Sequence, residues 1–83
     1  MPRDEDRVDD IIASARFIQA WVEGRSERSL EDRLLLSALV RELAIIGEAS
    51  SRLSPEFKAR YPEVEWRDIV QMRNILIHAY KPR

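Results

Sequence analysis

The sequence predicts an all-α protein, an antiparallel up-and-down helical bundle. Apolar residues recur at spacings of three and four over most of the chain, which is the period of an amphipathic helix. No segment shows the apolar–polar alternation of a half-buried strand, and residues that start or stop helices separate the periodic segments. With 83 residues, 45% hydrophobic and 35% charged, the chain is expected to form one small helical domain, residues 1–83.

The first helix is predicted from about Asp6 to Glu23, with Gly24 as its stop. Its apolar residues are Val8, Ile11, Ile12, Ala15, Ile18 and Val22. The acids that surround its start, at positions 4, 5, 6, 9 and 10, are interpreted as a solvated first turn, because carboxylates are favoured at a helix N-terminus.

The second helix is predicted from about Leu30 to Leu53, after a polar connector over residues 24–28. Ser29, followed three residues later by Asp32, resembles a capping arrangement. Its apolar stripe comprises Leu35, Leu36, Leu39, Leu43, Ile46 and Leu53. Gly47 lies inside this helix, where glycine costs about 1 kcal/mol relative to alanine. A glycine there predicts a close helix contact or a bend.

Two further helices follow. Ser54 as a cap and Pro55 at the first helical position start a short helix, Pro55 to Arg60, which Pro62 ends. The last helix is predicted from Glu65 or Trp66 to Tyr80, before Pro82 disfavours helical geometry.

Composition excludes several classes of protein. The chain has no cysteine, so it has neither a disulfide framework nor a thiolate metal site, which fits a reducing cytoplasm. No apolar run reaches the roughly 18 residues of a membrane span, and the N-terminus lacks a signal core, so a cytoplasmic protein without membrane contact is expected. One histidine and no cysteine disfavour zinc, while a carboxylate magnesium site stays open. The net charge of −1 means that any RNA contact must come from a local basic cluster.

The last predicted helix carries Arg73, Asn74 and His78, the only histidine. At about 100° per residue, these three share one side, and the apolar residues Met72, Ile75, Leu76 and Ala79 lie on the other, which we expect to face the core. Trp66, Val70 and Ile77 share the arc of Arg73 and His78. They would be exposed apolar groups in a monomer, so a partner surface, such as that of a second chain, is expected to cover them.

An ordinary structural interpretation also fits these residues. His78 ends a helix, where the helix dipole favours its cation, and Asn74 forms a local hydrogen bond. Arg73 then pairs with an acid such as Asp68 or Glu48. Trp21 and Trp66 are interpreted as core or interface aromatics.

The stretch from Arg73 to His78, an Arg and a His separated by four residues with a polar residue after the Arg, resembles the signature of the HEPN superfamily. Ala79 and Tyr80 complete the Arg-x4-His-x-Tyr form of HepT-like toxins. The segments 45–50, 53–55 and 66–72 also resemble the core segments of that family. The resemblance covers most of the chain from Val8 onward.

This resemblance implies the toxin subunit of a HEPN/MNT toxin–antitoxin pair, a metal-independent RNA endonuclease without a cofactor, in which two chains bring their motifs together. It assigns Arg73 and His78 as catalytic residues, with His78 exchanging a proton and Arg73 clamping the phosphate. Asn74 would orient the phosphate or the histidine, and Tyr80 would contact RNA. The cognate partner is a minimal nucleotidyltransferase antitoxin, which in some members adenylylates the tyrosine that Tyr80 matches.

One departure leaves alternatives open. Family members usually continue with a further helix after this tyrosine, whereas this sequence ends at Arg83. It is therefore expected to be a shortened member, a truncated form, or one that completes its core by oligomerisation. Three functional classes follow: an RNase toxin, a catalytically silent HEPN module that binds nucleotide or RNA, and a structural partner of an antitoxin.

Overall fold

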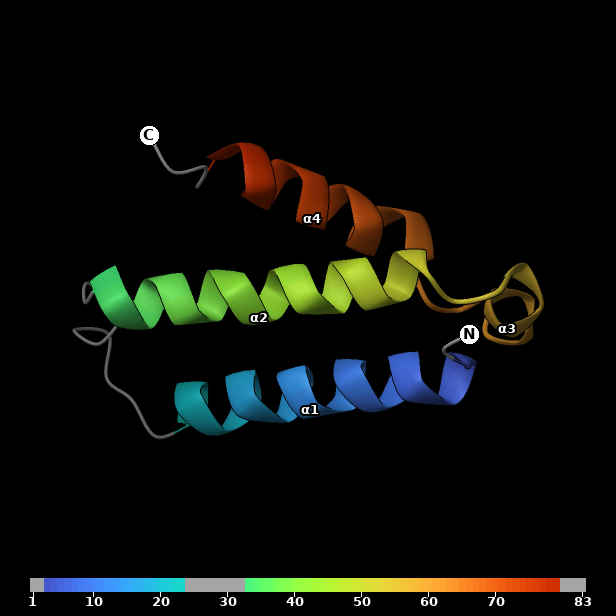
Figure 1. Cartoon of the computed structure of the whole chain (residues 1–83), viewed down its shortest axis with the longest axis horizontal. Coiled ribbons are helices and arrows are strands. Elements are labelled where there is room, and N and C mark those ends of the chain that lie inside the picture. The colour runs from blue at the N-terminus through green and yellow to red at the C-terminus, as the bar shows by residue number, and fades with distance from the viewer. Residues whose placement is uncertain (1–2, 24–32, 80–83) are drawn as a thin grey trace.

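The computed structural model describes residues 3–23 and 33–79, and within these ranges every regular element is a helix. The four helices are α1 (Asp4–Glu23), α2 (Arg33–Ser51), α3 (Pro55–Arg60) and α4 (Trp66–Ala79) (Figure 1). The predicted all-α class is confirmed.

Helix α2 lies between α1 and α4 and packs against both (Figure 1). It runs antiparallel to each, and the short α3 connects α2 to α4 at one end of the molecule. The arrangement is the predicted up-and-down bundle. Because α1 and α4 occupy opposite sides of α2, the three long helices form a layer. Most residues of α1 and α4 are accordingly exposed or half-buried.

The predicted helix bounds agree with the structure to within a few residues. α1 begins two residues earlier than expected, and α2 ends at Ser51, two residues earlier than expected, while its predicted start at Leu30 lies outside the described residues. α3 covers the predicted range, and α4 begins at the predicted Trp66. The predicted stop at Gly24 and cap at Ser29 lie outside the described residues, as does Tyr80.

Ser54 caps α3 and also connects it to the first turn of α1. Its hydroxyl accepts a hydrogen bond from the Phe57 N–H at 3.1 Å, as an N-cap does. The same hydroxyl donates to Asp4 at 2.6 Å, and the Ser54 N–H donates to the other Asp4 oxygen at 2.9 Å. These bonds lower the pKa of Asp4, chiefly through the side-chain hydroxyl, because they stabilise the carboxylate. Asp4 therefore does more than form part of a solvated turn, because it also bonds to a residue fifty positions away in sequence.

Three aromatic side chains pack together at the turn between α3 and α4. The Phe57 ring lies 5.0 Å from the Tyr61 ring and 6.2 Å from the Trp66 ring, centroid to centroid. The Trp66 indole N–H donates to the Tyr61 carbonyl at 3.1 Å. Such pairs add to apolar burial, so this cluster sets the direction in which α4 leaves α3.

The core is small. Its buried apolar residues among those described are Trp21, Ala49 and Leu53, and three small residues, Ser14, Gly47 and Ser50, are also buried. Trp21 is thus the core aromatic that was predicted, while Trp66 is only half-buried. An open apolar hollow of about 380 Å³, with Ile46 and Ile69 in its lining, lies where all four helices approach one another. None of the described helices is long and apolar enough to cross a membrane.

Candidate functional site

Helix α4 carries three of the four predicted site residues, and it exposes them to different degrees. Asn74 and His78 are exposed, whereas the Arg73 side chain is only 25% exposed. Tyr80 lies outside the described residues. Arg73 is therefore the residue whose surroundings the structure defines best.

Arg73 faces α2. An alanine-like Cβ placed on Gly47 would lie 2.9 Å from the Arg73 Cγ and 3.3 Å from its Cα, and it would overlap the Arg73 Cβ. Only glycine leaves room for so close an approach of the two helices. This confirms the close helix contact predicted from Gly47 and defines the α2–α4 seam, the contact of Gly47 and Glu48 with Arg73.

The prediction that Arg73 shares an outward side with Asn74 and His78, opposite the core, is wrong for Arg73. The seam turns Arg73 towards α2, and Ile75, expected on the core side, is 67% exposed. Apolar residues lie around most of the circumference of α4, so they do not select one face for packing. The contact with Gly47 instead sets how α4 is rotated about its axis relative to α2. Of the three apolar residues expected to need a partner, Trp66 and Val70 are half-buried within the chain, and Ile77 stays 47% exposed.

Glu48 is the acid that pairs with Arg73. The Arg73 Nη1 donates to the Glu48 Oε2 at 2.7 Å, a charge-assisted hydrogen bond across the seam. Of the two acids that the structural interpretation offered, Glu48 is therefore the partner. The Arg73 Nε is buried and has no hydrogen-bond partner among the described residues. The guanidinium is thus anchored by one terminal nitrogen against α2.

The other Glu48 oxygen is also occupied. Oε1 accepts from the Arg52 Nε at 2.8 Å, so one carboxylate binds two arginines. Sequence reasoning considered Glu48 as an ion-pair partner but did not identify Arg52. The available signal was the spacing of four residues between Glu48 and Arg52, which places both on one helix face.

His78 occupies the last turn of α4. It follows Arg73 by five residues, which on a helix is about 7.5 Å along the axis and about 140° around it. Arg73 thus lies at the seam while His78 is on the exposed surface beyond it. Within one chain, the paired Arg73 and the exposed His78 therefore lie on the same helix, but their side chains do not face each other.

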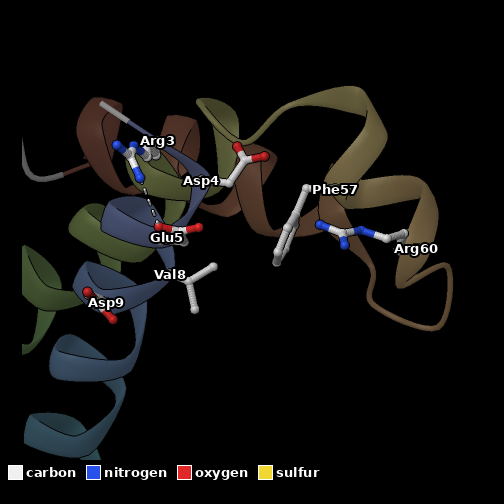
Figure 2. A pocket seen from close by; sticks show the side chains of 7 residues that line it. All are labelled: Arg3, Asp4, Glu5, Val8, Asp9, Phe57 and Arg60. Carbon is white, nitrogen blue, oxygen red and sulfur yellow. Dashed lines mark ion pairs between the residues drawn. The ribbon is translucent and has the colours of Figure 1, made fainter. Parts of the chain in front are cut away.

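A second hollow lies away from these residues. A pocket of about 430 Å³ lies between the start of α1 and α3. Asp4, Phe57 and Arg60 are among the residues that line it (Figure 2). The Arg60 guanidinium lies 5.4 Å from the Phe57 ring centre, and Arg3 forms an exposed ion pair with Glu5 at 3.9 Å. Exposed pairs of this kind contribute little, and no predicted site residue lines this pocket. Among the described residues, no three His, Asp or Glu side chains are grouped as metal ligands.

Comparison with known proteins places these features in a family. The model of the family described as "Ribonuclease HepT-like" matches residues 11–82, which include α2, the seam and all of α4. The chain belongs to the HepT-like ribonuclease family. The resemblance to HepT-like members of the HEPN superfamily, predicted from the Arg-x4-His-x-Tyr motif, is confirmed.

Curated relatives carry ribonuclease names. "Probable ribonuclease HepT" of Thermococcus cleftensis is 39% identical over 77 residues, which cover 92% of this chain and 70% of that protein. "Putative RNase MJ1380" of Methanocaldococcus jannaschii is 41% identical over 72 residues, 86% of this chain and 66% of that protein. "Putative RNase TTE0752" of Caldanaerobacter subterraneus is 39% identical over 74 residues, 88% and 66% of the two chains. The HepT-like chain described here therefore spans about two thirds of the length of these relatives. No solved structure matches it.

Proposed function

We propose that this HepT-like chain is an endoribonuclease that cleaves RNA without a metal ion, using Arg73 and His78. The observation that carries the proposal is that a chain of a ribonuclease family places Arg73 and its only histidine, the exposed His78, on the same helix. Arginine is always cationic and suits phosphate recognition, and histidine exchanges protons near neutral pH.

The reaction that suits these groups is transesterification within the RNA. A histidine imidazole takes the proton of the ribose 2′-hydroxyl while the 2′-oxygen bonds to the adjacent phosphorus. The bond from phosphorus to the 5′-oxygen breaks, and an imidazolium returns a proton to that oxygen. Arg73 stabilises the negative charge that develops on the phosphate. The products are a 2′,3′-cyclic phosphate and a 5′-hydroxyl.

A homodimer fits this chemistry. Two histidines are needed if base and acid are separate groups, and a symmetric dimer supplies the second. The arrangement of Arg73 and His78 on different arcs of α4 supports the same proposal, because a second chain can place its exposed His78 beside the phosphate that Arg73 binds. The exposed Ile77 lies next to His78 and is available for such an interface.

In its cellular role, the chain is proposed to be the toxin of a pair whose antitoxin is a minimal nucleotidyltransferase. Asn74 orients the phosphate or the histidine, and Tyr80 contacts RNA. Transfer of AMP to Tyr80 would add charge and bulk beside the motif and obstruct RNA phosphate. The family membership and the Arg-x4-His-x-Tyr motif support this part of the proposal.

A second candidate is a catalytically silent module that binds RNA or nucleotide. The observation that favours it is the engagement of Arg73 by Glu48, with the Arg73 Nε buried, which is how a structural cation is held. Such a module would bind RNA and leave it intact.

Purified protein incubated with total RNA in EDTA distinguishes the two candidates. The ribonuclease proposal predicts cleavage in EDTA with 2′,3′-cyclic phosphate or 3′-phosphate ends. DNA of the same sequence should stay intact, because it lacks the 2′-hydroxyl. RNA binding without cleavage would establish the silent module, and cleavage of DNA at a comparable rate would rule out the mechanism.

A further inference from the structure

The carboxylate of Glu48 brings two guanidinium groups together. Arg73 from α4 binds Oε2 at 2.7 Å, and Arg52, one residue beyond α2, binds Oε1 at 2.8 Å. Two guanidinium groups bound to one carboxylate repel each other, and the shared anion offsets that repulsion. The cluster of three charges retains a net charge of +1, on a chain whose overall charge is −1.

The two arginines differ in exposure in a way that suits different tasks. The Arg73 side chain is 25% exposed and fixed against Gly47, whereas the Arg52 side chain is 56% exposed. Glu48 binds Arg52 through Nε, so hydrogen bonds within the described residues leave both terminal nitrogens of Arg52 without an acceptor. Guanidinium groups present their donors in a planar fork that matches a phosphate, and this fork of Arg52 is open.

The positions of Arg52, Arg73 and His78 along the two helices give the order in which these side chains follow one another. α2 and α4 are antiparallel, and Arg52 follows the end of α2 that lies beside the start of α4. Arg52 and His78 are therefore on opposite sides of Arg73 along the α2–α4 seam. An RNA strand whose reacting phosphate lies at Arg73 and His78 would extend a neighbouring phosphate towards Arg52.

We infer that Arg52 is a further phosphate-binding residue, and that Glu48 is a positioning residue which holds Arg52 and Arg73 side by side to bind consecutive phosphates of single-stranded RNA. This inference rests on the proposed function. Glu48 touches no substrate in this scheme: it acts by fixing the two guanidiniums. Arg52 contributes binding, and Arg73 contributes binding and charge stabilisation.

The test measures binding and turnover separately for Arg52→Ala, Arg52→Lys and Glu48→Gln. The probe is a fluorescein-labelled uridine homopolymer, titrated by anisotropy over a series of salt concentrations. Arg16→Ala is the matched control, because Arg16 is an exposed arginine on α1, on the side of α2 opposite α4. Thermal unfolding of each variant checks that it is folded.

Arg52→Ala should raise Kd and KM about tenfold, the effect of losing one charge-assisted contact, and leave kcat within about twofold. The slope of log Kd against log salt should fall by about 0.7, the value for one phosphate contact on a single strand. Arg52→Lys should keep most of the salt slope and lose part of the affinity. Glu48→Gln should lower kcat as well as affinity, because it releases Arg73 too.

Unchanged affinity and salt slope in Arg52→Ala would overturn the inference, as would an equal loss in Arg16→Ala. If Glu48→Gln had the same kcat as the wild type, the proposed positioning role of Glu48 would be contradicted. If the wild type binds the RNA but does not cleave it, the proposed ribonuclease fails, and the binding data still decide the role of Arg52. If the wild type neither binds nor cleaves, both proposals fail.

Discussion

Gly47 on α2 lies directly against the side-chain stem of Arg73 on α4, closer than any other residue type would allow. The contact fixes the distance between the two helices and the rotation of α4. It also brings the Arg73 guanidinium to Glu48, the next residue along α2. The glycine, whose intrinsic effect on a helix is unfavourable, is therefore what makes this arrangement of charges possible.

Gly47→Ala should destabilise the protein, although alanine gains about 1 kcal/mol in helix propensity over glycine. The added methyl group overlaps the Arg73 Cβ, and overpacking of this kind costs about 1–3 kcal/mol. Because backbone-attached atoms meet, the helices must separate. Urea unfolding should show a lower midpoint than the wild type.

The double variant Gly47→Ala/Arg73→Gly tests the cause, because it removes the Arg73 Cβ and Cγ, the side-chain atoms that the new methyl group meets. The two substitutions should be less destabilising together than the sum of the single effects, with a coupling of about 1 kcal/mol or more. Additive effects would contradict the contact between these residues.

Asp4→Asn should remove a contribution to the free energy of unfolding that the wild type itself loses at acid pH. The hydrogen bonds from Ser54 lower the pKa of Asp4 in the folded protein, so the unfolded chain binds its proton more readily. The contribution is present above the unfolded pKa of aspartate, about 3.9, and is lost as the pH falls through the lower folded pKa. Unfolding midpoints measured from pH 2 to pH 7 should therefore differ most between wild type and Asp4→Asn above about pH 4.

Asp10→Asn is the control for this measurement, since Asp10 is an exposed acid of the same helix. The unfolding midpoints of Asp10→Asn should depend on pH below about pH 4 in the same way as those of the wild type. If Asp4→Asn followed the wild-type curve at every pH, the bond between Asp4 and Ser54 would not contribute to folding.

Ile77→Glu should dissociate the proposed homodimer. Ile77 is 47% exposed next to His78 on α4, and a buried carboxylate at an interface is costly. Phe17→Glu is a matched control, because Phe17 has the same 47% exposure on α1. Sedimentation at micromolar concentration should give dimer for wild type and Phe17→Glu, and monomer for Ile77→Glu. A monomeric wild type would contradict the dimer, and dissociation by Phe17→Glu alone would place the interface on α1.

Tyr80 should gain one adenylyl group when the protein is incubated with its nucleotidyltransferase and ATP. Peptide mass spectrometry should locate the group on Tyr80, and Tyr80→Phe, which lacks the acceptor hydroxyl, should stay unmodified. Neutralisation of toxicity without any mass change would favour simple occlusion by the antitoxin.

The sequence predicted the helices well because their signals are local. Ser54, Pro55 and Pro62 mark both ends of α3, and the structure places α3 at Pro55–Arg60. The close contact at Gly47 was also predictable, since a glycine inside a helix has few other uses. The motif on α4 identified the family because its residues are adjacent in sequence.

The orientation of Arg73 could not be predicted in this way. Helical periodicity relates residues of one helix to each other, but it does not say which arc meets the neighbour when apolar residues surround the helix, as Ile75 and Ile77 do on α4. The bond between Asp4 and Ser54 was missed for a related reason: it joins positions far apart in sequence, and only the fold brings them together.

The cleavage rate of His78→Ala on RNA, measured in EDTA beside its RNA affinity, tests the central claim most directly. The account predicts a rate about 10²–10⁴-fold below that of the wild type, the usual cost of losing a general acid or base, with RNA binding largely retained. His78→Gln, which keeps a polar side chain that cannot exchange a proton near neutral pH, should be equally impaired. Wild-type cleavage by either folded variant would contradict the assignment of His78 and the mechanism built on it.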